Sequence, residues 1–355
     1  MKKKVLIVDD SAFMRRIIRQ MVESEPTFEV VGTARDGQEG VELTLKLKPD
    51  VITMDVEMPR MNGLEATEAI MAKQPTPILI VSSLTTEGAQ ATLDALDKGA
   101  VDFLAKNLVS SALDVMKIRD ELVNKLKLVA RSKSALTRIK SSPKKTPGVI
   151  TPAGPGGTPR KTFATQRMAI VAIGASTGGP RAVQDVLSKL PGSLSTTFVV
   201  SVHMPGAFTT AFAQRLNSLS ELTVREAVNG EKLQDGVVLV SPGGRQTRVK
   251  RRGVTNFTIE ISDDPPDSLY KPAIDIMMSS VAEAYPGRSL GVILTGMGHD
   301  GLEGMTLIRN KGGKTLVQDE ATSTVYGMPK AVIEADMADK IAPIDLIAGE
   351  IVNMI

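Results

Sequence analysis

A stretch in the middle of the chain cannot belong to a hydrophobic core, and it constrains the fold more than any other feature. Residues 131–167 consist largely of serine, threonine, proline, glycine, lysine and arginine, with few large apolar side chains. Such segments act as flexible tethers because they have little apolar surface to bury. We therefore expect two domains, residues 1–122 and 167–355. Residues 123–166 are expected to hold the end of a helix and a flexible basic linker.

Composition excludes several classes of protein. The chain has no cysteine, which excludes disulfides and thiolate chemistry and favours a reducing compartment such as the cytoplasm. No run approaches the roughly 18 apolar residues of a membrane-spanning helix, so no membrane insertion is expected. The net charge of +3 is small and the basic residues gather in the linker. A solvated tether explains them better than contact with nucleic acid.

The first part of the chain alternates short apolar runs with amphipathic stretches. The runs at 4–8, 51–54 and 78–81 predict buried strands, and the periodicity of 11–23 and 37–47 predicts helices. This alternation is typical of an α/β domain in which helices cover both faces of a parallel sheet.

The predicted strands end in side chains that suit phosphoryl chemistry. Asp9 and Asp10 follow the first run, Asp55 the second and Ser82 the third, and Lys106 follows a fourth. The carboxyl ends of parallel strands share one edge of a sheet, so these groups should meet. Three carboxylates in one crevice repel unless a divalent cation is bound, and oxygen ligands suit Mg²⁺. The pattern predicts phosphoryl transfer to Asp55, with Lys106 and Ser82 contacting the phosphoryl oxygens.

Four motifs in this part resemble the receiver domain of two-component response regulators: VLIVDDSAFMRR, VITMDVEMPRMNGLEA, ILIVSSLT and GAVDFLAKN. The resemblance covers about residues 1–122 and implies a flavodoxin-like fold. It implies that Asp55 accepts phosphate from a histidine kinase. It also implies that the backbone carbonyl of Glu57 joins Asp9 and Asp10 in holding Mg²⁺.

The same resemblance assigns a switching role to three residues, Ser82, Phe103 and Lys106. Receivers usually have proline directly after this lysine, whereas Asn107 stands here. The peptide geometry of that loop is therefore left open.

A serine in the second part lies between an apolar run and an amphipathic stretch. Gly174-Ala-Ser-Thr-Gly178 follows a strand expected over 168–173 and precedes a helix expected over 180–190. The G-x-S-x-G pattern at such a turn is typical of a nucleophile elbow, which makes Ser176 a candidate nucleophile. A phosphate-binding turn is the alternative, although the spacings of dinucleotide and P-loop motifs are absent.

A serine nucleophile needs a base, and the chain has two histidines, His203 and His299. His203 follows an apolar run one strand–helix unit after Ser176, so it should emerge at the same sheet edge. A glycine-rich segment after another apolar run carries Asp300, our candidate for the acid that orients the imidazole. His299 is the competing base. Weaker candidates for the acid are Asp275, Asp319 and Asp336.

The segments GASTGGP, SVHMPGAFTTAFAQRLN, KPAIDIM and VILTGMGHDGLEGM are similar to the catalytic domain of the chemotaxis protein-glutamate methylesterase family, CheB. The resemblance covers residues 167–355, and the receiver in front matches the domain order. It implies a nucleophilic Ser176, a general acid/base His203 and an orienting Asp300. It assigns the oxyanion-binding amides to Thr177 and Met297. The chain order of serine, histidine and aspartate differs from that of α/β-hydrolases.

That resemblance implies hydrolysis of methyl esters on chemoreceptor glutamates, and deamidation of receptor glutamines, through an acyl-enzyme and without a cofactor in this domain. The fold expected for it is a Rossmann-like parallel sheet, with an antiparallel hairpin over 245–261. We expect the unphosphorylated receiver to obstruct the active site. The alternatives are a nucleic-acid-binding output domain and a nucleotide-dependent enzyme.

Overall fold

The computed structural model describes residues 2–106, 112–131, 168–253 and 255–355. Most of the predicted linker, and Asn107 after the lysine, lie outside the described residues. Among the residues that are described, no helix is both long and apolar enough to span a bilayer.

The first sheet has five parallel strands in the order β2-β1-β3-β4-β5. This is the flavodoxin-like order, as expected. Its strands are β1 (Lys3–Val8), β2 (Phe28–Ala34), β3 (Val51–Asp55), β4 (Ile78–Ser82) and β5 (Asp102–Ala105). Its helices are α1 (Ala12–Glu23), α2 (Gly37–Leu47), α3 (Gly63–Lys73), α4 (Thr86–Asp97) and α5 (Ala112–Val129).

Alternate residues of these strands build two cores. Val5 and Ile7 of β1 pack with α1 and α5, whereas Leu6 and Val8 belong to the core that holds α2, α3 and α4. Polar side chains fix where helices begin: Asn62 accepts a hydrogen bond from the amide of Glu65 and forms a capping box at the start of α3.

The second sheet has seven parallel strands in the order β14-β13-β12-β6-β7-β9-β8. Its strands are β6 (Ile170–Ala175), β7 (Thr197–Val202), β8 (Thr223–Glu226), β9 (Val237–Val240), β12 (Ser289–Ile293), β13 (Lys314–Gln318) and β14 (Lys340–Ala342). Its helices are α7 (Gly179–Leu187), α8 (Gly206–Leu219), α9 (Ile274–Ala284), α10 (Leu302–Asn310), α11 (Met328–Glu334) and α12 (Ile344–Met354). The predicted α/β class is confirmed for both sheets.

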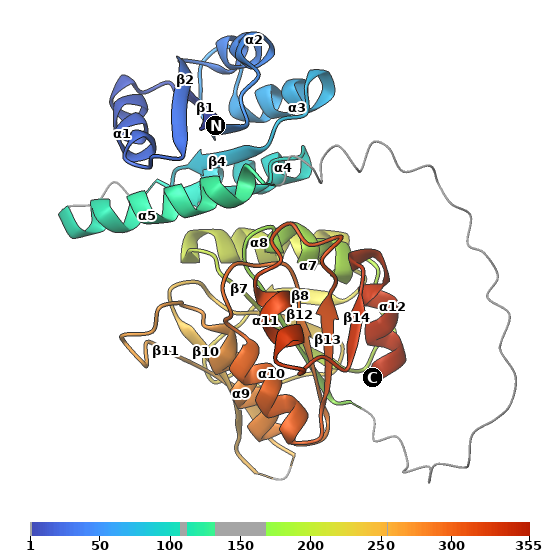
Figure 1. The fold of residues 1–355 in the computed structure, drawn as a ribbon. Helices are drawn as coiled ribbons and strands as arrows, with labels where there is room; N and C mark the ends of the chain where they lie inside the picture. Colours follow the sequence, from blue (N-terminus) through green and yellow to red (C-terminus); the bar gives the residue numbers. More distant parts are fainter. Residues whose placement is uncertain (1, 107–111, 132–167, 254) are drawn as a thin grey trace, which may run out of the picture.

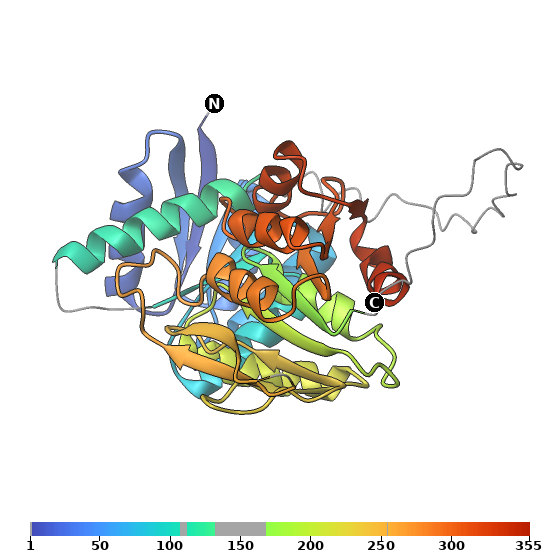
Figure 2. The same ribbon diagram turned by 90° about the horizontal axis from the view of Figure 1, so that it is seen from below.

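The expected hairpin is also present, as an antiparallel pair separate from the parallel sheet. It consists of β10 (Gln246–Arg251) and β11 (Phe257–Ser262). The hairpin packs beside α9, through Val249 and Ile259 on its inner side, and both ribbon views place it at one side of the second sheet (Figures 1 and 2).

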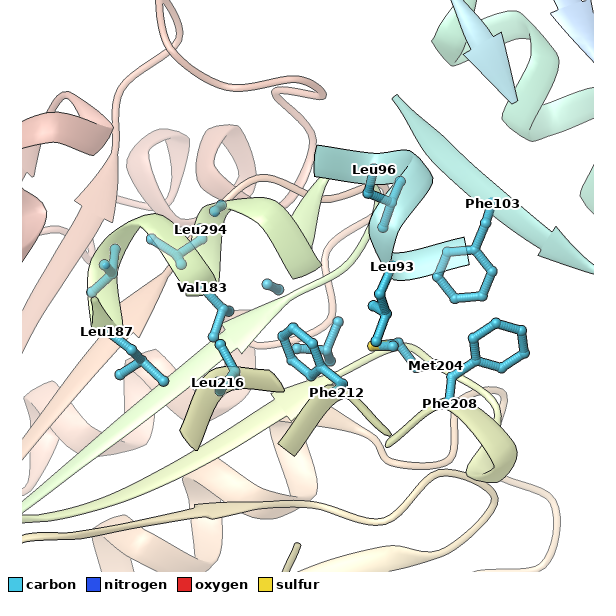
Figure 3. Packing of buried hydrophobic residues seen from close by; sticks show 14 of the residues in the cluster. Leu93, Leu96, Phe103, Val183, Leu187, Met204, Phe208, Phe212, Leu216 and Leu294 are labelled. Carbon is cyan, nitrogen blue, oxygen red and sulfur yellow. The ribbon is translucent and has the colours of Figure 1, made fainter. Parts of the chain in front are cut away.

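The two sheets are joined by a shared apolar core, in which α4 of the first part packs against α8 of the second (Figure 1). Leu93 of α4 points towards Met204, and Leu96 and Phe212 belong to the same buried cluster (Figure 3). The ring of Phe103 on β5 stacks on that of Phe208, with centroids 4.6 Å apart.

Charged groups border this contact. Arg215 of α8 forms ion pairs with Asp94 and Asp97 of α4, the former at 2.5 Å. Gln184 of α7 donates to Asp97 at 3.1 Å. The contact therefore combines an apolar centre with a polar border, as protein interfaces commonly do.

Candidate active site

The carboxyl edge of the first sheet brings the predicted acidic residues together. Asp9 and Asp10 follow β1, and Asp55 is the last residue of β3. One carboxylate oxygen from each lies within 4.8 Å of the other two. The Nζ atom of Lys106 lies 2.9 Å from Asp9 Oδ2 and 2.8 Å from Asp55 Oδ2.

The electrostatics of this cluster suit a cation. Burial and, to a smaller extent, the neighbouring Asp9 carboxylate raise the pKa of Asp55 to about 6, against the hydrogen bond and charge of Lys106. A divalent cation would relieve this repulsion, and carboxylate oxygens are the ligands that Mg²⁺ prefers. The three carboxylates therefore fit Mg²⁺.

The remaining residues predicted for this site lie around the cluster. Glu57 is exposed, two residues after Asp55. Ser82 is buried at the end of β4, and its hydroxyl donates to the carbonyl of Gly88 in α4 at 3.2 Å. Phe103 is buried against Phe208, as described above. In this conformation Ser82 and Phe103 thus contact the elements that form the contact between the sheets.

The carboxyl edge of the second sheet brings Ser176, His203 and Asp300 together. Ser176 directly follows β6, and its amide donates to Thr295 at 3.0 Å. His203 directly follows the adjacent strand β7. His203 Nδ1 lies 3.1 Å from Ser176 Oγ, and His203 Nε2 lies 2.7 Å from Asp300 Oδ2.

The start of α9 fixes Asp300. The amide of Ile274 donates to Asp300 Oδ2 at 2.7 Å, and that of Asp275 donates to Oδ1 at 2.9 Å. Burial alone would raise the pKa of Asp300, but the hydrogen bond and charge of His203 and these two amides lower it below the usual value. Asp300 is therefore ionised at neutral pH.

The ionised acid determines the tautomer of His203. A carboxylate can only accept hydrogen bonds, so the proton resides on Nε2 and the hydrogen bond to Asp300 is donated by the imidazole. Nδ1 then carries a lone pair and accepts the hydrogen bond of the Ser176 hydroxyl. A serine whose hydroxyl already points at a base is poised for deprotonation.

The competing candidates lie elsewhere. His299 is exposed beside Asp300. Asp319 accepts hydrogen bonds from Thr322 in its own loop, and Asp336 lies at a left-handed position just after α11. Within the described part of the chain, none of these side chains bonds to Ser176 or His203.

Asp275 lies closer to the site than its sequence pattern indicated. Its Oδ1 atom accepts a hydrogen bond from the amide of Gly304 at 2.8 Å. Burial and the nearby charge of Asp300 raise its pKa to about 6 despite this bond. Asp275 is therefore a second carboxyl group behind Asp300, without contact to the imidazole.

The predicted oxyanion-binding amides belong to residues next to Ser176 in the chain or next to its close neighbour Gly296. Thr177 is the next residue, and the preceding neighbour of Met297, Gly296, packs so closely that a Cβ there would lie 2.9 Å from Ser176 Cβ. Within the described residues, the amides of Thr177 and Met297 form no hydrogen bond. Both remain available to a ligand oxygen.

Sequence reasoning missed one residue of the site. The ring of Tyr270 stacks on the ring of His203, with centroids 4.1 Å apart and an angle of 8° between the planes. Tyr270 lies in a loop without hydrophobic periodicity, and no pattern pointed to it.

Comparison with known proteins identifies both halves. Residues 171–351 match the family model described as CheB methylesterase, and residues 5–116 match the response regulator receiver domain. A protein-glutamate methylesterase/protein-glutamine glutaminase of Geobacter sulfurreducens is 48% identical, over 99% of this chain and 98% of its own. One from Nitratidesulfovibrio vulgaris is 45% identical, over 98% of each chain.

Among solved structures, the catalytic domain of Thermotoga maritima CheB methylesterase is similar, with a TM-score of 0.51 and 37% identity. The match covers 53% of this chain and 99% of that one. The chain therefore belongs to the CheB methylesterase family, as an ester hydrolase with a response regulator receiver domain in front of its catalytic domain.

Proposed function

We propose that this protein removes methyl esters from glutamate side chains of chemoreceptors, and deamidates receptor glutamines, through an acyl-enzyme on Ser176. The observation that carries the proposal is the continuous hydrogen-bonded chain from Ser176 through His203 to Asp300. The names of the relatives, protein-glutamate methylesterase/protein-glutamine glutaminase, support protein glutamate esters and glutamines as substrates. The family resemblance supports chemoreceptors as the proteins that carry them.

Acylation begins when His203 Nδ1 takes the proton of Ser176 Oγ as that oxygen attacks the ester carbonyl carbon. The amides of Thr177 and Met297 donate to the oxyanion that develops. His203 then gives its proton to the departing methoxide, so methanol leaves and the glutamyl group stays on Ser176. With a glutamine substrate the same proton goes to the departing amine, and ammonia leaves.

Deacylation repeats these steps with water. His203 Nδ1 accepts a proton from the attacking water, the oxyanion forms at the same amides, and its collapse returns the proton to Ser176 Oγ. The products are free glutamate and the starting enzyme. Asp300 stays ionised and stabilises the imidazolium in both halves of the reaction, a role whose loss costs about 10⁴ in kcat in serine hydrolases.

The receiver part is proposed to accept a phosphoryl group on Asp55. A carboxylate oxygen of Asp55 attacks the phosphorus of a phosphohistidine on a histidine kinase, the P–N bond breaks, and an acyl phosphate forms. Lys106 neutralises phosphoryl oxygens from its place between Asp9 and Asp55. Bound Mg²⁺, held by Asp9, Asp10, Asp55 and the Glu57 carbonyl, would supply further charge neutralisation.

The contact between the sheets supports regulation by this phosphoryl group. The helix α8 that receives α4 begins three residues after His203, so the receiver lies beside the active-site edge. Phosphorylation replaces the single negative charge of the Asp55 carboxylate with a phosphoryl group of about −1.5 to −2 and draws Ser82 towards Asp55, which Lys106 already contacts. Ser82 and Phe103 both contact α4 or α8, and a difference of about 1–3 kcal/mol between the two states suffices for a switch.

The proposal places the protein in the cytoplasm, where the kinase and the cytoplasmic helices of chemoreceptors would meet it. It involves no nucleic acid and no insertion into the membrane. Residues 1–122 would form the regulatory domain and residues 167–355 the catalytic domain, with 123–166 as their connection.

The test of the mechanism is labelling with a serine-directed phosphonate, followed by mapping of the modified peptide. We expect a single adduct on Ser176, and no labelling or methanol release with Ser176→Ala. His203→Ala should lose about 10³-fold or more in kcat, since the hydroxyl loses its base. The matched control is His299→Ala, which removes an exposed imidazole and should retain activity. An adduct on another residue, or turnover by Ser176→Ala, would contradict the proposal.

A further inference from the structure

The two hydrogen bonds of His203 do not by themselves restrain a tilt of its ring. Ser176 holds Nδ1 and Asp300 holds Nε2, so both fixed points lie on the line through the two nitrogens. Small changes in the side-chain torsions of His203 can tilt the ring about that line while both nitrogens move little. Because hydrogen bonds to a ring nitrogen weaken when they leave its plane, such a tilt would misalign both bonds.

The ring of Tyr270 blocks this tilt. It lies against one face of the imidazole, at 4.1 Å between centroids and within 8° of parallel. A Cβ atom at Gly298 would lie 3.6 Å from the Tyr270 hydroxyl, so the far end of the ring reaches the glycine-rich segment that carries Asp300. Tyr270 therefore extends from the imidazole to the loop that holds its acid.

Tyr270 is itself held by its backbone. Its carbonyl accepts hydrogen bonds from Gln246 Nε2 and from Ser268 Oγ, both at 2.8 Å. Gln246 is the first residue of β10 and is fully buried. Such a side chain holds one position because the burial of an unpaired amide is costly.

The other end of the same amide reaches α9. Gln246 Oε1 accepts a hydrogen bond from the amide of Ala273 at 2.8 Å. Ala273 precedes the first turn of α9, whose amides of Ile274 and Asp275 hold Asp300. A single buried glutamine thus connects the residue stacked on the imidazole with the helix end that fixes the acid.

From these contacts we infer that Tyr270 is a positioning residue for His203, which holds the imidazole plane in line with Ser176 and Asp300, and that Gln246 holds Tyr270 in place. The inference rests on the proposed role of His203 as the general acid/base. It also gives the β10–β11 hairpin a part in the reaction, although the hairpin supplies no group that touches the reacting atoms.

A second stacked pair, formed by one residue of the hairpin and one residue after α9, serves as a reference. The rings of Phe257 on β11 and Tyr285 after α9 lie 4.1 Å apart at an angle of 21°. Neither residue bonds to Ser176, His203 or Asp300 within the described residues. This pair stabilises the packing of the hairpin and leaves the imidazole untouched.

The experiment compares Tyr270→Phe, which keeps the aromatic face, with Tyr270→Leu, which removes it at similar size. The control is Tyr285→Leu, which removes a tyrosine that stacks on Phe257 of the hairpin. Steady-state methanol release is measured with the full-length phosphorylated protein and membranes that carry methylated chemoreceptors. Circular dichroism and thermal melting establish that each variant is folded.

We expect Tyr270→Phe to stay within about 2-fold of the wild type. Tyr270→Leu should lose about 10- to 100-fold in kcat with KM nearly unchanged, because a small misplacement of a catalytic group costs up to about 100-fold. Tyr285→Leu should lower the melting temperature and leave kcat unchanged. Proton NMR should show the His203 Nε2 proton broadened or shifted in Tyr270→Leu alone, a signature that a packing defect in the hairpin would not produce.

Three results would overturn the inference. Wild-type kcat in Tyr270→Leu would show that the imidazole needs no stacked ring. If Tyr270→Phe lost as much kcat as Tyr270→Leu, the Tyr270 hydroxyl, and not the stacked ring, would be what supports turnover. If Tyr285→Leu lost as much kcat, the loss in Tyr270→Leu would be explained by weakened packing of the hairpin. Failure of the proposed function itself would look different, since the wild type would then release no methanol, or Ser176→Ala would release as much.

Discussion

At the scale of single residues, the active site requires a glycine at one position as well as reactive side chains at others. Gly296 packs its backbone against Ser176, and its carbonyl accepts hydrogen bonds from the amides of Gly327 and Met328. A methyl group at this position would meet Met328 Sδ at 2.2 Å and Ser176 Cβ at 2.9 Å. Close approach of this kind requires glycine.

We therefore expect Gly296→Ala to displace Ser176 and to reduce kcat by about 10-fold or more, measured as methanol release, since displacement of the nucleophile is costly. The control is Gly349→Ala in the exposed part of α12, where an added methyl group meets no atom within 4 Å. That change should raise stability by about 0.5–1 kcal/mol and leave turnover unchanged. Wild-type kcat in Gly296→Ala would mean that the turn containing Ser176 can move to accommodate the methyl group without loss of activity.

The residues predicted from sequence share a simple placement, and Tyr270 does not. Ser176 and His203 each stand directly after a buried apolar run, and parallel strands bring such positions to one edge. Tyr270 reaches the imidazole from a loop whose course is set by Gln246, a contact between residues 24 apart in the chain. Contacts of this kind depend on tertiary structure and leave no periodic pattern in the sequence.

At the scale of elements, the sequence predicts the strands that coincide with a short apolar run. It does not predict the strands at the edge of the second sheet. β8 consists of Thr223–Glu226 and has one buried residue. Its short sequence, with two charged residues, is also typical of a loop. The sheet order places β9 between β7 and β8, which no local pattern encodes. Helix α8 follows His203 and receives α4, so it links the chemistry to the receiver.

Arg215 on α8 gives this link a testable prediction. Its guanidinium is mostly buried and pairs with Asp94 and Asp97 across the contact. Arg215→Ala should weaken docking by about 0.4–1.4 kcal/mol and raise the activity of the unphosphorylated protein about 2- to 10-fold. Methanol release without a phosphodonor measures this.

The control for that variant is Lys189→Ala, which removes an exposed ion pair with Asp345 inside the second part of the chain. It should leave the unphosphorylated activity unchanged. If Arg215→Ala is no more active than this control, the ion pairs across the contact do not hold the receiver in place.

At the scale of the whole molecule, the receiver part packs through α4 against α8, the helix that follows His203. If the receiver obstructs the active site, as proposed, removal of residues 1–140 should raise methanol release in the absence of a phosphodonor. The truncated and full-length proteins are compared at equal concentration, with Asp55→Asn in the full-length chain as the control that cannot be phosphorylated. Equal or lower activity of the truncated protein would argue against obstruction by the receiver.

The continuous apolar core between α4 and α8 has a consequence for the activated protein. Leu93, Phe103 and Phe208 are almost fully dehydrated while the two parts are packed together. If phosphorylation separates the two parts, these apolar side chains become exposed to solvent. Their exposure raises the heat capacity of the protein and favours its self-association. The signalling state would then be the less soluble one, and rapid loss of the phosphoryl group would protect the cell from aggregates as well as end the signal.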